Sequence, residues 1–217
     1  MELYEVMRTT FACRQFTGDA LPADVLHRII DSARFAPSGG NRQGWRIINV
    51  TQDSTKERLA ELSLPAAGQY LLQQQAGESP LNTIHPSSIT EEQLAEAQPP
   101  HALVEHIRSA PTLLVVTVDL GLVASMDKGL DRIGLVSGGS IYPLAWNILL
   151  GARNEGYSGT MTTWGVANEP EIQTLLGIPP HWAVATIMPL GKPVKQLTRL
   201  KRKPVEDILC TDRWDAL

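Results

Sequence analysis

The eleven residues from Phe35 to Trp45, FAPSGGNRQGW, combine a helix stop, a flexible backbone and several hydrogen-bonding side chains. Pro37 ends a preceding helix, while Gly39 and Gly40 accept positive φ angles and let a ligand approach the backbone closely. The polar side chains of this stretch are those of Ser38, Asn41, Arg42 and Gln43. Such a loop can hold a planar ligand with polar edges, but Gly and Pro also punctuate ordinary helix-to-strand turns.

Two later segments contain residue types that bind anions. The turn GYSGTMTT at residues 156–163 places glycines before hydroxyl side chains, and its backbone N–H groups can face a ring edge or a phosphate. A basic cluster follows near the C-terminus: Arg199, Lys201, Arg202 and Lys203. Such charges usually form a solvated surface run, but against an anionic cofactor they form a phosphate clamp.

Motifs for other chemistries are missing from the sequence. It contains no G-x-S-x-G elbow of a hydrolase and no G-x-G-x-x-G loop of a Rossmann nucleotide site. The histidines do not have metal-binding spacing, so we interpret each as a surface or packed residue: His27, His85, His101, His106 and His181. Cys13 is interpreted as a small packed side chain. We therefore assign no metal ligand.

Composition indicates one globular domain over residues 1–217. The chain is 43% hydrophobic and 19% charged, which is typical of folded proteins of this length. Its net charge of -4 argues against nucleic acid or an anionic membrane as partner. Cys13 and Cys210 are too few and too far apart for a disulfide framework, which favours a reducing, cytoplasmic location.

Hydrophobic periodicity predicts both helices and strands. Helices are expected at residues 22–34, 54–64, 101–108, 137–155 and 169–176, and strands at 45–50, 112–118 and 182–190. Residues 66–100 have little periodicity, so we expect most of them to form a long excursion. The 137–155 helix is apolar on more than one side, which predicts that the domain or a second subunit encloses it, and we expect a dimer.

In this order, the segments resemble the FMN-dependent nitroreductase family. The shared segments are Arg14-Gln15-Phe16, Ala33 to Trp45, Leu144 to Thr160, Leu175 to Trp182, Leu190 to Pro193, and Arg202-Lys203-Pro204. The resemblance covers most of the chain. It implies an α+β fold with a mainly antiparallel central sheet flanked by helices, and an interlocked homodimer with two FMN molecules at its interface.

The resemblance also implies a flavin contact set: Arg8, Arg14, Pro37, Ser38, Gly39, Gly40, Asn41, Gln69, Gly159, Thr160 and Arg202. Arg14 is expected at the ribityl chain or pyrimidine edge, where a cation stabilises the anionic reduced ring. Residues 37–41 are expected to come from the other subunit. Residues 159–160 would line the opposite ring edge, Gln69 would place an amide against the flavin, and Arg202, with Lys201 or Lys203, would hold the phosphate.

Two departures from the family pattern affect this expectation. Thr10-Phe11-Ala12 stands where family members commonly have Arg-Arg-Ser, so two cations and a hydroxyl are absent. The phosphate must then rely more on Arg8, Arg14 and the C-terminal cluster, or flavin binds less tightly. Gly44 replaces a usual proline and loosens the turn.

The resemblance implies chemistry carried by the cofactor, so no side chain is assigned as catalytic. NAD(P)H would deliver a hydride to the flavin and leave, and a nitroaromatic, quinone or similar small acceptor would then take the electrons in a ping-pong cycle. Dehalogenation and flavin fragmentation occur in related members. A non-catalytic flavin carrier or sensor is the alternative from another functional class.

Overall fold

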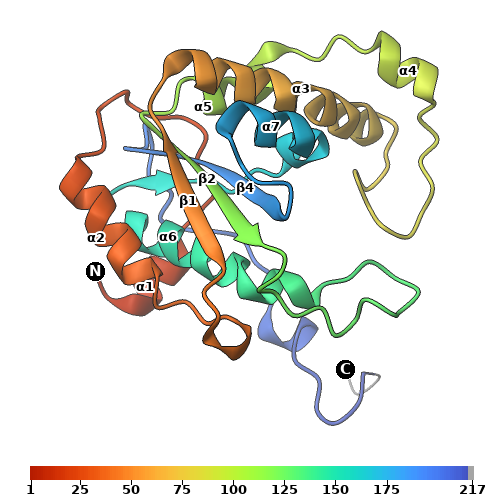
Figure 1. The fold of residues 1–217 in the computed structure, drawn as a ribbon. Helices are drawn as coiled ribbons and strands as arrows, with labels where there is room; N and C mark the ends of the chain where they lie inside the picture. The colour runs from red at the N-terminus through yellow and green to blue at the C-terminus, as the bar shows by residue number, and fades with distance from the viewer. Residues whose placement is uncertain (215–217) are drawn as a thin grey trace.

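A four-stranded antiparallel sheet forms the centre of the chain in the computed structural model, which describes residues 1–214 (Figure 1). The strand order is β1-β2-β4-β3, with β1 at Trp45–Val50, β2 at Thr112–Asp119, β3 at Ser158–Gly159 and β4 at Trp182–Gly191. Trp45 pairs with Val118, whereas Thr112 pairs with Leu190, the partner of Gly159. Trp45 and Gly159 therefore lie at opposite ends of the sheet.

Helices cover both faces of this sheet (Figure 1). The α-helices are α1 Leu3–Thr9, α2 Ala23–Ala33, α3 Asp53–Gln75, α4 Glu91–Glu96, α5 Glu105–Arg108, α6 Tyr142–Asn154 and α7 Glu169–Leu176. The 3-10 helices are η1 Gly39–Asn41, η2 His101–Val104, η3 Val136–Ser140, η4 Trp164–Asn168 and η5 Val205–Asp207. The expected α+β class with a mainly antiparallel sheet is confirmed.

Successive side chains of β2 point to opposite faces of the sheet, so the hydrophobic core has one part on each face. Leu114 and Val116 pack with α2 and α6, while Leu113 and Val115 pack with α3, α5 and α7. Every residue of β2 before Asp119 is buried, as expected for a strand covered on both sides.

The largest difference from the predicted elements is in α3. The helix does not end at Leu64 but continues through Pro65 to Gln75, so the first part of the expected excursion is helical. A proline inside a helix removes a hydrogen bond. Here the flanking residues Leu62, Ala66 and Ala67 are buried, and this packing holds the helix together across the proline. The α1 helix was not predicted, and the 137–155 helix is divided at Ile141 into η3 and α6.

Residues 76–100 form the excursion, which carries α4 away from the sheet (Figure 1). The Glu78 carboxylate closes its first loop by accepting hydrogen bonds from the Ser87 and Ser88 hydroxyls. The chain then returns over α3, where a Cβ on Gly68 would lie 2.9 Å from Cγ of Pro99. The glycine at this position lets the excursion pack closely on the helix.

The 120–135 loop, between β2 and η3, is organised by one carboxylate. Asp127 is only 4% exposed and accepts hydrogen bonds from the backbone N–H of Leu135 at 2.7 Å and from Nη1 of Arg132 at 2.8 Å. The Leu135 N–H, followed by the Arg132 guanidinium, lowers the pKa of Asp127 to about 2.

Acid is expected to weaken this loop. Because the folded-state pKa of about 2 lies below the usual 3.8, the carboxylate stabilises the fold above pH 4 and loses this effect between about pH 4 and 2. Asp127→Asn should therefore have a lower melting temperature than the wild type at pH 6. The difference between the two melting temperatures should become smaller as the pH falls. Thermal unfolding from pH 6 to pH 3 measures this. Asp131→Asn, an exposed position on the same loop, is the control, and a pH-independent gap for Asp127→Asn would contradict the assignment.

Candidate functional site

The segment around Arg14 is held against the sheet edge formed by β3. The backbone N–H of Cys13 donates to the carbonyl of Gly159 at 2.9 Å, and the carbonyl of Gln15 accepts from Val194 at 3.1 Å. The side chain of Arg14 is exposed. Two parts of the predicted contact set, Arg14 and residues 159–160, therefore lie side by side in one chain.

Close packing explains the glycine at position 159. A Cβ there would lie 2.5 Å from the carbonyl oxygen of Pro189 and would also clash with Leu190. The neighbouring Thr160 is buried, and its backbone N–H donates to the same Pro189 carbonyl at 3.3 Å. Packing against β4 requires this glycine whether or not a ligand binds nearby.

Gly159→Ala is expected to destabilise the fold by about 1–3 kcal/mol, because the methyl group meets backbone that cannot rotate away. Gly129→Ala is the matched control, since a Cβ at Gly129 would meet no atom within 4 Å. Urea unfolding of both variants gives the comparison. Equal free energies of unfolding for the two variants would show that the sheet edge can accommodate the methyl group, and the prediction would be wrong.

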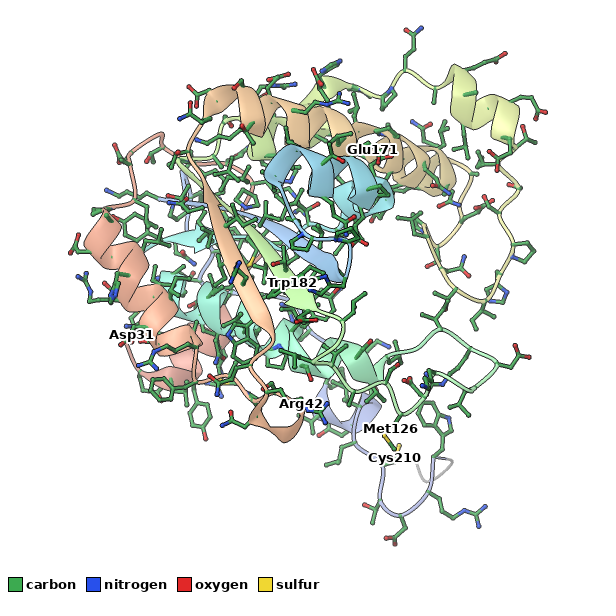
Figure 2. All side chains as sticks on the ribbon, viewed as in Figure 1. Asp31, Arg42, Met126, Glu171, Trp182 and Cys210 are labelled. Carbon is green, nitrogen blue, oxygen red and sulfur yellow. The ribbon has the colours of Figure 1, made fainter. Side chains whose placement is uncertain are left out.

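The 37–43 loop lies at the other end of the sheet, just before β1 (Figure 1). Three of its residues have positive φ: Gly40 at 61°, Asn41 at 53° and Gln43 at 51°. The Gly39 N–H donates to Oγ of Ser140 at 3.1 Å, and the Gln43 N–H donates to Oγ of Ser38 at 2.9 Å. Arg42 is labelled on this loop in Figure 2. Unusual backbone held by such contacts is common in ligand-binding loops.

Gln69 lies on α3 beside a cavity of about 490 Å³, which is lined by parts of α3, the 94–99 segment and η4. Its neighbour Tyr70 contacts Trp164, with ring centroids 5.9 Å apart. Trp164 in turn contacts His106 on α5, with centroids 6.2 Å apart and the rings nearly perpendicular. A series of ring contacts thus leads from Tyr70 on α3 to His106 on α5.

His106 is a buried, neutral imidazole at the end of this series. Its side chain is 3% exposed. Burial is the main cause that lowers its pKa to about 4, and the positive charge of Arg14 is the second cause. The histidine is therefore packed, as predicted, but the effect of the Arg14 charge on its pKa was not foreseen.

Comparison with known proteins identifies the family. Residues 7–192 match the Nitroreductase family. The chain belongs to this family. Human iodotyrosine deiodinase 1 is 24% identical over 213 residues, which are 97% of this chain and 68% of that protein.

Solved structures share the nitroreductase fold. An NADPH:FMN oxidoreductase from Vibrio harveyi, complexed with NAD+, superposes with a TM-score of 0.70 at 19% identity and covers 99% of this chain and 79% of its own. An iodotyrosine deiodinase bound to FMN and 3-iodo-L-tyrosine also superposes with a TM-score of 0.70, at 18% identity. The match covers 98% of this chain and 100% of the deiodinase chain. The fold thus occurs in proteins that bind FMN.

The arginines of this nitroreductase-family protein fit an anionic cofactor. Among residues 1–214, five arginines form ion pairs with carboxylates: Arg28, Arg34, Arg58, Arg108 and Arg132. Arg8, Arg14 and Arg202 form none within that range, and the same is true of Arg42, Arg46, Arg153 and Arg199. Arg8 lies over the Tyr4 ring, and Arg202 donates to the carbonyl of Lys201 at 2.8 Å. Guanidinium groups without a carboxylate partner are suited to bind phosphate or an anionic ring.

One chain does not bring the whole contact set together. Residues 37–41 and Arg14 lie at opposite ends of the sheet, and within residues 1–214 no hydrogen bond or ion pair joins Arg202 to either. Sequence reasoning also missed the Tyr70, Trp164 and His106 contacts, which join residues far apart along the chain. Over the same described range, no cluster of three or more metal-ligating side chains occurs, and no helix is long and apolar enough to cross a membrane.

Proposed function

We propose that this protein is an FMN-dependent oxidoreductase whose two active sites each combine residues of two identical subunits. The observation that carries the proposal is the separation of Arg14 and Gly159 from the 37–41 loop by the length of the sheet. A twofold dimer places one end of each subunit against the other end of its partner, so both sites are completed at once. FMN binding by solved proteins of this fold supports the choice of cofactor.

Exposed apolar side chains support the dimer. Met126 is 86% exposed and Leu135 is 71% exposed on the loop that leads into α6, and Trp146 of α6 is also exposed. The C-terminal segment adds Ile208, at 68%, and Leu209. Figure 2 shows Met126 and Cys210 on these two segments, which extend from the body of the protein. Apolar surface on this scale is rare in a soluble monomer and favours a covering partner.

In the bound state, FMN supplies hydride-transfer chemistry, and the protein binds and orients it. Arg14 stabilises negative charge at the pyrimidine edge, where reduction makes the ring anionic. The Ser38 hydroxyl and Asn41 amide form hydrogen bonds to the ring from the partner subunit. Arg202, with Arg8 and Lys201 or Lys203, binds the phosphate. None of these groups transfers a proton, so we assign no catalytic side chain.

NAD(P)H is the proposed electron donor, which the NAD+ complex of the Vibrio harveyi oxidoreductase supports. Anaerobic addition of stoichiometric NADPH or NADH to the FMN-loaded protein is expected to bleach the flavin band near ~450 nm, and a quinone or nitroaromatic should restore it. Stopped-flow absorbance measures both halves, and initial rates should follow a ping-pong pattern. A flavin band that neither nucleotide bleaches would favour the non-catalytic carrier or sensor.

Reductive dehalogenation is the second candidate, and the deiodinase relatives favour it. Dithionite-reduced protein would then release iodide from 3-iodo-L-tyrosine, with reoxidation of the flavin. Free FMN reduced in the same way is the control. Turnover of a quinone together with no iodide release above that control would restrict the protein to the first candidate.

A further inference from the structure

His106 has an unused hydrogen-bond acceptor beside the proposed flavin site. The Nε2 atom of this buried imidazole has no hydrogen-bond partner. In the neutral tautomer that carries its proton on Nδ1, Nε2 presents a lone pair that can accept a hydrogen bond. Within residues 1–214, this is the single buried side-chain nitrogen or oxygen that lacks a partner. A buried polar atom without a partner is costly, so such atoms commonly find one in the functional state.

Arg14 is the donor that the surrounding structure provides. Phe16, two residues after Arg14, packs into the same hydrophobic cluster as Ile107, the residue that follows His106. Both segments thus border the same cluster, and the positive charge of Arg14 contributes to lowering the pKa of His106. The guanidinium of Arg14 has only donors, is exposed and has no carboxylate partner among the described residues. A neutral imidazole nitrogen complements it, whereas a protonated imidazole would repel it.

We propose that His106 is a positioning residue for Arg14: its Nε2 accepts an N–H of the guanidinium and so fixes this cation against the pyrimidine edge of FMN. The inference rests on the proposed function. It explains why an acceptor is retained in a buried position and why the histidine is kept neutral. The contact between His106 and Arg14 also offsets part of the FMN affinity lost with the phosphate-binding residues that the Thr10-Phe11-Ala12 segment lacks. A cation that is already fixed loses less conformational freedom when FMN binds.

A double-mutant cycle on FMN binding tests the inference. The variants are His106→Phe, which keeps a ring but removes the acceptor, Arg14→Ala, and both together. His106→Phe should weaken FMN binding about tenfold, but less than about twofold when Arg14 is already absent. His106→Gln, which retains an acceptor, should recover most of the affinity. Quenching of FMN fluorescence gives the dissociation constants, and melting temperatures of the apo proteins check folding. His27→Phe, on the exposed side of α2, is the control.

A second measurement needs no FMN. In the apo protein, Arg14→Ala should raise the pKa of His106, followed by NMR, because a neighbouring positive charge is removed while Glu105 stays in place. An unchanged pKa would overturn the inference. So would additive losses from His106→Phe and Arg14→Ala, or full FMN affinity in His106→Phe, and in those cases FMN binding and the proposed function stand. A wild-type protein that takes up no FMN would overturn the proposed function and the inference with it.

Discussion

Mixing two inactive variants, Arg14→Glu and Ser38→Glu, is expected to restore FMN binding at about a quarter of the sites. Each substitution places a carboxylate against an anionic ligand, so each homodimer alone should lose FMN almost completely. Random exchange of subunits makes half of the dimers mixed, and each mixed dimer has one site with both defects and one with neither. The restored site combines Arg14 from one subunit with Ser38 from the other.

Flavin retained after dilution, mixing and gel filtration measures this complementation. The control is a chain that carries both substitutions, which mixing with itself cannot rescue. Separate preparations of each single variant give the baseline. If Arg14 and Ser38 of the same chain formed one site, mixing would restore nothing, and the interlocked architecture would be wrong.

Local sequence signals were sufficient for several regular elements of this fold, but not for all of them. Both ends of β1 and α7 match the predicted ranges 45–50 and 169–176, because β-branched residues and a helical apolar stripe mark them clearly. The α3 helix was underestimated because Pro65 is a strong local stop signal, and the contacts that override it come from tertiary packing. The excursion was recognised by its lack of periodicity, although its start was placed too early.

The candidate site was predictable only in part, for a similar reason. Arg14 and the 37–41 loop lie in recognisable motifs, whereas the contacts of Tyr70, Trp164 and His106 depend on the folded chain. Gly159 is the reverse case. Its position in a motif predicted a contact with a ligand, whereas its surroundings show that close packing against Pro189 and Leu190 requires a glycine. A glycine in a motif can therefore serve the fold, and only the surrounding atoms distinguish the two roles.

Arg202→Ala is expected to weaken FMN binding about ten- to a hundredfold, because a guanidinium forms charge-assisted hydrogen bonds with a phosphate. Arg202→Lys keeps the charge but loses the planar pair of donors, so its affinity should fall between those of Ala and the wild type. Arg199→Ala is the matched control, since Arg199 is exposed on the same segment. Equilibrium titration of apo protein with FMN at constant ionic strength measures all three.

The structure also predicts what Arg202→Ala leaves unchanged. In the apo chain the Arg202 side chain is exposed and donates a hydrogen bond to the carbonyl of the adjacent Lys201, so the melting temperature without FMN should match the wild type. The gain in melting temperature on adding FMN should be smaller in the variant, because ligand stabilisation follows affinity. Loss of affinity equal to that of Arg199→Ala would instead indicate a diffuse basic surface, and the phosphate would then depend on Arg8 and Arg14 at the other contact segment.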